Sequence, residues 1–336
     1  MAATIKDIAK RTGLGLATIS KYLNGGNVRD KNRVVIEAAI REMDFTVNEF
    51  ARGLKTRRSR TVGVVIPELS NGFITTIISA MEDVLRRESY GVLVCDCRSD
   101  PELETQAISF LQGKQVDALA LMSVGGDASH LLPHLNEALP LVLIDRDVPG
   151  LEARADAVLV NNFSAAKQCT ELLLKAGHEK IGIVLGPKRI HTSKQRRNGY
   201  RMALSGAGML PDSALICHTD YSIRGGLEAT KELLAGNPGI TALFVTNYET
   251  TVGAMLALGE LGIRVPEQLS LIGFDNLELA QIFHPPLTVV EQPMEQIGRE
   301  AAALLLARLR GDNEAARRVL LDTALRQGES VKRLIP

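Results

Sequence analysis

Short, almost wholly apolar segments recur from residue 61 onward and constrain the fold more than any other feature. A first set comprises 62–67, 91–97, 118–122, 141–145 and 157–160, and a second comprises 180–186, 242–246 and 269–275. Helical patterns separate several of these segments, and apolar strands that alternate with helices are typical of parallel sheets covered on both faces. Two successive sets predict two lobes, and ligands in such open sheets bind beyond the carboxyl ends of the strands.

The first 60 residues follow a different pattern, with helices and no apolar strand. Residues 5–11 predict a helix whose N-cap is Thr4, and Asp7 completes an acidic capping pattern. Gly13 allows a turn before a second helix, expected over 16–24. A third helix over about 31–43 is expected to direct these side chains inward: Val34, Val35, Ala38, Ala39 and Met43. Two short helices around a glycine-bearing turn are the layout of a helix-turn-helix DNA reader.

The charge distribution agrees with DNA binding by this first part of the chain. Residues 1–60 hold 13 Lys and Arg against 6 Asp and Glu, whereas the remainder holds 26 against 33. A basic head on an acidic body indicates a nucleic-acid-binding module joined to a part with another task. The neutral balance of the whole chain conceals this asymmetry.

The outward face of the second helix carries side chains suited to a major groove. Thr18 and Ser20 are short hydroxyls that fit phosphate oxygens and so fix register. Lys21 can donate to guanine O6 and N7, and Leu16 and Ala17 can contact thymine methyl groups. We therefore expect these five residues to contact double-stranded DNA.

The stretch TIKDIAKRTGLGLATISKYLNG resembles, without a gap, the opening of the lactose-repressor (LacI/GalR) family of transcription regulators. The family's usual Ser before the recognition helix is Gly15 here, which weakens the N-cap by a few tenths of a kcal/mol. By this resemblance, the positions that set operator sequence fall on Leu16, Ala17 and Lys21. The resemblance implies a dimer that binds a near-palindromic operator with two recognition helices.

Residues 48–55 resemble the family's hinge helix, and residues 56–60 form a basic linker. The resemblance implies that Leu54 from each protomer wedges between base pairs in the minor groove, with Lys55 beside it. Gly53 lowers the helix propensity of this short segment. We therefore expect the hinge to fold only on the operator.

The resemblance continues through PELSNGFITTIISAMEDV, AGHEKIGIVLG, QRRNGYRMAL and RVPEQLSLIGFDN. It implies an α/β fold in which a helix-turn-helix domain (1–47) and a hinge with linker (48–60) precede a two-lobed, periplasmic-binding-protein-like domain (61–336) that binds the effector and dimerises. The lobes would span roughly 61–161 plus 293–322, and 162–292 plus the C-terminal end, with three crossovers. The family's effector-binding positions correspond to Phe73, Arg146, Thr192, Arg196, Tyr221, Asn247, Asp275 and Gln292.

These residue types suit a polar small molecule. Asp275 and Arg196 can make charge-assisted hydrogen bonds to hydroxyls. Two carboxylates common in the family are replaced, because Tyr248 follows Asn247 and Asn161 precedes Asn162. A sugar, a sugar acid or a sugar phosphate all remain open, and the pair Arg146 and Arg196 favours an anionic one.

The sequence therefore predicts a ligand-controlled transcription regulator, most simply a repressor and a homodimer. Alternatives are a corepressor-type or carbon-catabolite regulator of the same family and, in another class, a solute-binding protein. An enzyme is not expected, since no G-x-G-x-x-G, Walker A or G-x-S-x-G signature occurs. The chain shows no signal-peptide pattern or membrane-length apolar run, so a cytoplasmic protein is expected. We expect no cofactor. We also expect no metal site, because Cys95 and Cys97 alternate along one strand and should point to opposite faces.

Overall fold

The computed structural model describes residues 3–23, 26–45, 58–275 and 277–334. The chain forms two compact units, 1–59 and 60–336. The predicted hinge, with Leu54 and Lys55, lies outside the described residues.

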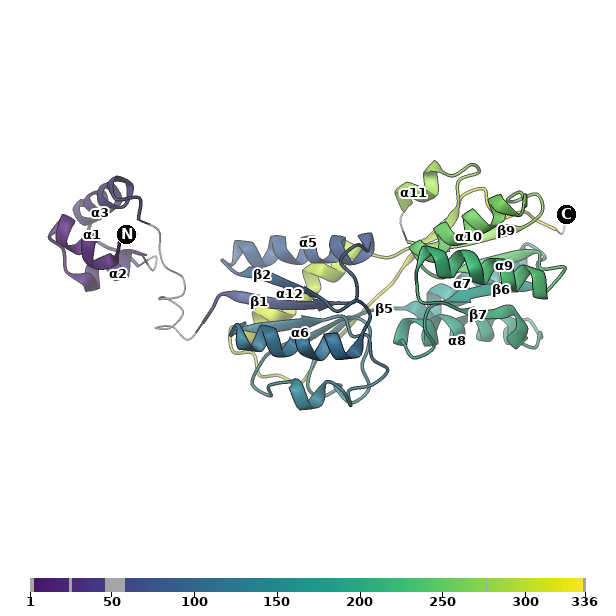
Figure 1. The fold of residues 1–336 in the computed structure, drawn as a ribbon, viewed down its shortest axis with the longest axis horizontal. Coiled ribbons are helices and arrows are strands. Elements are labelled where there is room, and N and C mark those ends of the chain that lie inside the picture. Colours follow the sequence, from purple (N-terminus) through teal and green to yellow (C-terminus); the bar gives the residue numbers. More distant parts are fainter. Residues whose placement is uncertain (1–2, 24–25, 46–57, 276, 335–336) are drawn as a thin grey trace. The chain divides into compact units, whose positions relative to one another are not determined.

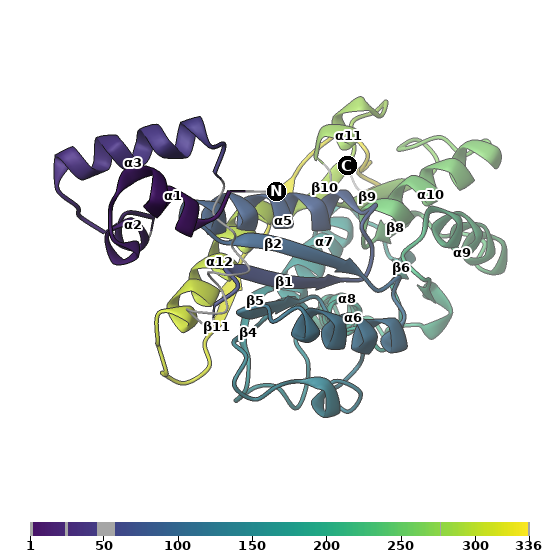
Figure 2. The ribbon, with the colours of Figure 1, turned by 60° about the vertical axis from the view of Figure 1, so that its left-hand side comes forward.

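The first unit consists of α1 (Ile5–Thr12), α2 (Leu16–Leu23) and α3 (Asp30–Glu42), which pack around one another (Figure 2). The predicted capping box is confirmed at α1. The Asp7 amide donates to Thr4 Oγ1 at 3.4 Å, and the Thr4 amide donates to Asp7 Oδ2 at 2.9 Å. Gly13 ends α1 in the left-handed region with φ of 68°, a conformation that glycine adopts without strain.

The core of the first unit is small. Ile8, Ile19 and Ile36 are fully buried, one from each helix. The expected inward set on α3 was correct for Ala39 and Met43 but wrong at three positions, since Val34 is 62% exposed, Val35 is 45% exposed and Ala38 is exposed. The helical period explains the difference, because the inward stripe runs i, i+3, i+4 and i+7 from its first member. Its members are Ile36, Ala39, Ile40 and Met43.

Lobe 1 of the second unit contains a six-stranded parallel sheet in the order β11-β5-β4-β3-β1-β2. Helices α5 (Gly72–Arg87) and α12 (Met294–Leu309) cover one face, and α6 (Pro101–Gly113) covers the other (Figure 1). The strands are β1 (Thr61–Ile66), β2 (Gly91–Asp96), β3 (Ala118–Leu121), β4 (Leu141–Asp145), β5 (Asp156–Val160) and β11 (Arg318–Leu321), with the short 3₁₀ helix η1 (Leu132–His134) after β3.

Lobe 2 repeats this plan with the order β12-β10-β9-β8-β6-β7, in which only β12 runs antiparallel. Its strands are β6 (Ile181–Leu185), β7 (Ile216–His218), β8 (Ala242–Val245), β9 (Ser270–Phe274), β10 (Thr288–Glu291) and β12 (Ala324–Arg326). Its helices are α7 (Asn162–Lys175), α8 (His191–Gly206), α9 (Ile223–Gly236), α10 (Tyr248–Glu260) and α11 (Leu277–Ile282), with η2 (Ser213–Leu215) before β7.

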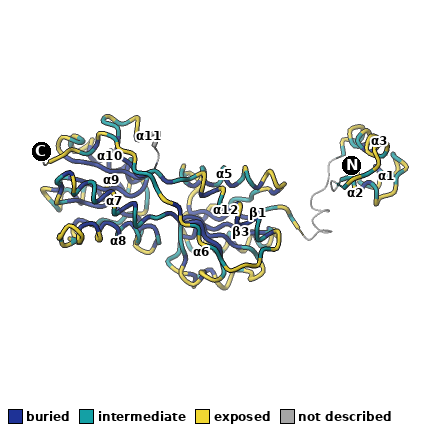
Figure 3. Tube along the Cα trace, turned by 180° about the vertical axis from the view of Figure 1, so that it is seen from behind, coloured by how far each residue is buried: buried dark blue, intermediate teal, exposed yellow. Residues whose placement is uncertain are grey.

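Strands buried on both faces form the centre of each lobe (Figure 3). In β1, Val62 and Val64 face the layer of α5 and α12, whereas Val65 faces that of α6. In lobe 2, Ile183 packs with α7 and α8, and Val184 packs with α9 and α10. The near-continuous apolar runs in the sequence are therefore explained by helices on both faces of each sheet.

The chain passes between the lobes three times, after β5, after β10 and after β11. The predicted α/β fold, with a three-helix head and two parallel-sheet lobes, is confirmed. Among the described residues, no helix is both long enough and apolar enough to cross a membrane.

Candidate functional site

The first candidate surface is the exposed face of α2. Leu16 is 46% exposed, and Ala17 and Lys21 are exposed as well. Thr18 and Ser20 are half-buried. Because Ile19 on the opposite side is fully buried, α2 has one face in the core and one face that presents the predicted DNA-contacting residues.

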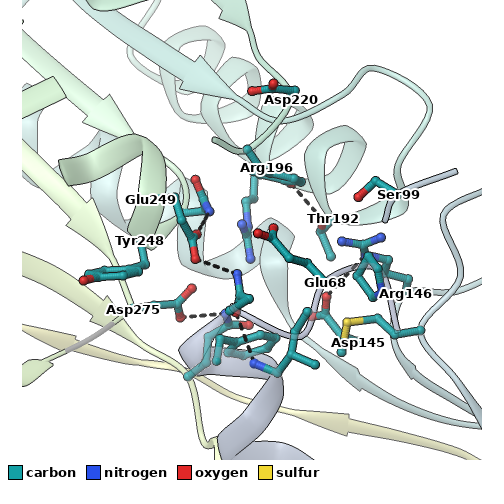
Figure 4. Close-up of a pocket in the computed structure, with 18 residues that line it drawn as sticks. Glu68, Ser99, Asp145, Arg146, Thr192, Arg196, Asp220, Tyr248, Glu249 and Asp275 are labelled. Carbon is teal, nitrogen blue, oxygen red and sulfur yellow. Dashed lines mark hydrogen bonds and ion pairs between the residues drawn. The ribbon is translucent and has the colours of Figure 1, made fainter. Parts of the chain in front are cut away.

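The second candidate site is a cleft between the two lobes (Figure 4). All eight residues expected to bind the effector line this single cleft. They follow the carboxyl ends of strands, where open α/β sheets bind ligands. From lobe 1 come Phe73 and Arg146; from lobe 2 and the crossover come Thr192, Arg196, Tyr221, Asn247, Asp275 and Gln292.

Arg196 lies at the base of the lobe 2 side of the cleft and is 3% exposed. Its Nε donates to Asn162 Oδ1 at 2.7 Å, and its Nη1 donates to the Thr246 carbonyl. The guanidinium carbon lies 3.9 Å from the centre of the Phe274 ring. Fixed by these contacts, the guanidinium is held in one orientation before any ligand arrives.

Asp275 is 7% exposed and accepts a hydrogen bond from Gln292 Nε2 at 2.7 Å. Burial raises the pKa of Asp275 to about 6, although Arg196 and the Gln292 hydrogen bond act in the opposite direction. A carboxylate that is buried and incompletely compensated is typical of a functional site.

The lobe 1 side presents a second acid–base pair, Asp145 and Arg146. Arg146 Nη1 donates to the Ser123 carbonyl at 2.9 Å, and its Nε lies 3.9 Å from Asp145 Oδ2. Burial raises the pKa of Asp145, against the effect of Arg146. Within the described part of the chain, three buried atoms at this cleft have no hydrogen-bond partner: Asp145 Oδ1, Arg146 Nε and Gln292 Oε1.

Tyr221 and Asn247 are held by local structure. The Tyr221 hydroxyl lies 2.8 Å from Ser193 Oγ and 3.2 Å from Thr192 Oγ1. Tyr221 has φ of 69°, and its ring packs where a Cβ on Gly186 would stand. Asn247 caps α10, since its Oδ1 accepts from the Thr250 amide at 3.1 Å. Asn247 thus serves the fold as well as lining the cleft.

The cleft also contains acidic residues that the sequence reasoning missed: Glu68, Asp145, Asp220 and Glu249. Asp145 ends an apolar segment that was predicted as a strand, so its position at a carboxyl end was an available signal. Glu249 had a weaker signal, because it stands two residues after Asn247 in the first turn of a helix.

Comparison with known proteins identifies relatives of this chain. Residues 4–48 match the family model described as "Bacterial regulatory proteins, lacI family", and residues 170–331 match that of the "Periplasmic binding protein-like domain". The ribose operon repressor of Haemophilus influenzae is 31% identical over 330 residues, covering 98% of each chain. The repressor CytR of Escherichia coli K12 is 32% identical over 325 residues, covering 96% of this chain and 95% of the relative.

A solved complex of the transcriptional regulator CelR with cellobiose superposes with a TM-score of 0.75 at 29% identity, covering 98% of this chain and 99% of the other. A three-helix DNA reader followed by a two-lobed ligand-binding body defines the class as DNA-binding transcription regulators. Within that class, the chain belongs to the LacI family of bacterial regulatory proteins. This family assignment favours the regulator over the solute-binding alternative.

Proposed function

We propose that the protein is a transcriptional repressor that binds a near-palindromic operator as a homodimer and is controlled by a small molecule in the cleft. The DNA-binding part of this proposal rests on α2, which has one buried face and one exposed face. The similar proteins named as repressors support the direction of control. A lac repressor dimer bound to operator, which shares this fold with a TM-score of 0.87 at 24% identity, supports the assembly.

On the operator, Leu16, Ala17 and Lys21 read base edges, and Thr18 and Ser20 contact phosphates. Leu54 and Lys55 of the hinge occupy the minor groove at the centre of the operator. The exposed side chains of α2 supply the first set, and the sequence resemblance alone supplies the hinge pair.

The effector is a sugar, a sugar acid or a sugar phosphate that contacts the eight cleft residues. Direct hydrogen bonds already join the lobes. Asn71 Nδ2 donates to Glu249 Oε1 at 2.7 Å, and Arg189 Nε donates to the Val124 carbonyl at 3.1 Å. A ligand that contacts both lobes binds the open and closed arrangements of the lobes with different affinities. Such a difference is what allows a ligand to control operator binding.

The test is fluorescence anisotropy on duplexes selected from a randomised palindromic library with a central CG step, with and without sugars, sugar acids and sugar phosphates. Lys21→Ala should weaken binding to the selected duplex at least about tenfold, because it removes a base contact. Lys114→Ala, an equal loss of charge on the exposed surface of lobe 1, should leave it unchanged.

An added compound that weakens operator binding would establish induction, and one that tightens it would establish the corepressor type. Equal losses for both lysine variants would contradict the assigned reading face. Operator binding that responds to no compound would contradict control through the cleft.

A further inference from the structure

The cleft contains more acidic than basic side chains. Five carboxyl groups line it, and two guanidinium groups, Arg146 and Arg196, stand against them. Asp145, Glu249 and Asp275 are buried or half-buried, whereas Glu68 and Asp220 are exposed. The five carboxyl groups belong to Glu68, Asp145, Asp220, Glu249 and Asp275.

Each guanidinium is already partly committed to protein groups. Arg196 uses Nε and Nη1 on Asn162 and the Thr246 carbonyl, and its plane covers the Phe274 ring. Arg146 uses Nη1 on the Ser123 carbonyl and lies beside Asp145. A site built for a phosphate or a carboxylate needs a guanidinium fork or a cluster of free amides turned toward the anion. The two arginines instead offset buried acids of the protein.

The unsatisfied atoms point to the missing partner. Within the described residues, Asp145 Oδ1 and Gln292 Oε1 are buried acceptors without a donor, and Arg146 Nε is a buried donor without an acceptor. Asp145 is 5% exposed and Gln292 is 3% exposed, so bulk water does not satisfy these atoms at the surface. Leaving buried donors and acceptors unpaired is costly, and a ligand rich in hydroxyls can satisfy both kinds, because a hydroxyl donates as well as accepts.

Glu249 gives this acidic lining its position at the lobe boundary. It belongs to lobe 2, and its Oε1 accepts from the amide of Asn71, which caps α5 of lobe 1. The Asn247 amide contacts its other oxygen. Glu249 therefore places a carboxyl group at the boundary between the lobes, and the charge of the buried Asp275 opposes its ionisation.

We infer that Glu249 selects uncharged, hydroxyl-rich effectors of the sugar type over their anionic analogues. This inference rests on the proposed function and narrows its ligand class. It departs from the expectation, drawn from Arg146 and Arg196 in the sequence, of an anionic ligand. The structure differs from that expectation because both arginines already serve protein acceptors.

The pH dependence of ligand binding distinguishes the two ligand classes. Burial raises the pKa of Glu249 to about 7, and the charges of Asp275 and Glu68 act in the same direction. A ligand hydroxyl donates to the ionised carboxylate, so an uncharged ligand should bind more weakly as the pH falls below about 7. An anionic ligand should bind more tightly there. The charged and titratable groups that line the cleft around Glu249 are Glu68, Asp145, Arg146, Arg196, Asp220, Tyr221, Tyr248 and Asp275.

The experiment is calorimetry on the full-length protein with matched pairs of compounds at pH 8 and pH 6. The pairs are ribose and ribose 5-phosphate, glucose and gluconate, galactose and galactonate, and cellobiose and cellobionate. We expect at least one uncharged member to bind, its charged partner to bind at least about tenfold more weakly, and the affinity of the uncharged member to fall at pH 6.

Glu249→Gln keeps the size and one oxygen that can accept from Asn71, but it removes the charge and the second acceptor that the Asn247 amide contacts. It should narrow the difference in affinity between the charged and uncharged members of the binding pair by about tenfold. It should also reduce the pH dependence, without abolishing it, because Asp275 has a pKa of about 6. Glu260→Gln, at the exposed end of the same helix, is the matched control and should change neither. If Glu249 had only a structural role, Glu249→Gln would lower the affinities for both members of the pair together and leave their ratio unchanged.

Tighter binding of a charged member than of its uncharged partner would overturn the inference, and so would binding of none of the eight compounds. The proposed function would be contradicted by a different result, namely an operator affinity that does not change with any compound that binds in the cleft. The two failures are therefore separated by running the anisotropy assay beside calorimetry.

Discussion

Two buried aspartates, one in each lobe, show how the same type of side chain can have different roles. Asp156 of lobe 1 accepts from Arg308 Nε and Nη2, both at 2.7 Å, and from the Arg317 amide at 2.7 Å. Burial acts to raise the pKa of Asp156, yet these hydrogen bonds outweigh it and lower the pKa. Asp275 of lobe 2 has fewer compensating partners, and its pKa rises to about 6. An acid whose partners are all protein groups stabilises the fold, whereas an acid left short of partners is available to a ligand.

The largest effect should come from breaking the satisfied acid. Asp156→Ala leaves the mostly buried Arg308 without its bidentate partner, and we expect a loss of about 3–5 kcal/mol in the free energy of unfolding. Urea unfolding followed by circular dichroism measures it. A loss below about 1 kcal/mol would show that the cluster around Asp156 is not structural.

Removing the charge of the unsatisfied acid should affect ligand binding instead. Asp275→Asn preserves volume, and we expect it to weaken the sugar found by the paired calorimetry about 100-fold, because a charge-assisted hydrogen bond is lost. Operator affinity without sugar should remain at the wild-type value. If operator affinity fell by a similar factor, Asp275 would have a structural role like that of Asp156, which would contradict the distinction between the two aspartates.

The two kinds of acid should give stability opposite dependences on pH. The pKa of Glu249 is raised to about 7, so its contribution to stability is present at low pH and is lost as the pH rises through about 7. Glu249→Gln should therefore raise the melting temperature by a few degrees at pH 8 and leave it unchanged at pH 4. Differential scanning calorimetry across this range provides the check.

For Asp156 the sign is reversed. Its pKa is lowered, so its contribution is present above the ordinary aspartate pKa of 3.8 and is lost as the pH falls. The stability difference between wild type and Asp156→Ala should shrink toward pH 3. A difference that stayed constant with pH would mean that packing, and not the charge of Asp156, carries the effect.

The smallest effect is expected for an acid that shares the cleft but is exposed. Glu68→Gln should change sugar affinity less than about twofold, because water screens a charge at the rim. A change as large as that of Asp275→Asn would show that location in the cleft, and not burial, determines the role of an acid.

Sequence patterns predicted eight of the strands, β1 to β6, β8 and β9, but missed the short strands β7, β10, β11 and β12. Apolar runs identify strands reliably when both faces of a sheet are covered, as in β1 and β6. The eight cleft residues followed from family resemblance, and the fold brings them together. On α3, by contrast, Val34 and Val35 are apolar yet exposed, because a helix has an inward face that hydrophobicity alone does not select.

The acidic cleft residues that the sequence analysis missed illustrate a second limit of prediction from sequence. Whether Asp145 is satisfied depends on Arg146 and on distant atoms such as the Ser123 carbonyl, which the sequence does not place. The role of Glu249 depends on Asn71, 178 positions earlier in the chain. Contacts across a cleft are properties of the folded chain, so local patterns identify the residue types but not their charge balance.

The three passages between the lobes have a consequence for synthesis on the ribosome. Lobe 1 begins at residue 61, yet it obtains α12 and the edge strand β11 only from residues 294–321, and lobe 2 obtains its edge strand β12 only from 324–326. Neither sheet is complete until the last residues have been translated, whereas the three-helix unit is finished within the first 45. A chain truncated before residue 318 would carry a complete DNA reader on two unfinished sheets. It would lose the effector response and the dimerisation expected of residues 61–336, while the three-helix unit kept its own fold.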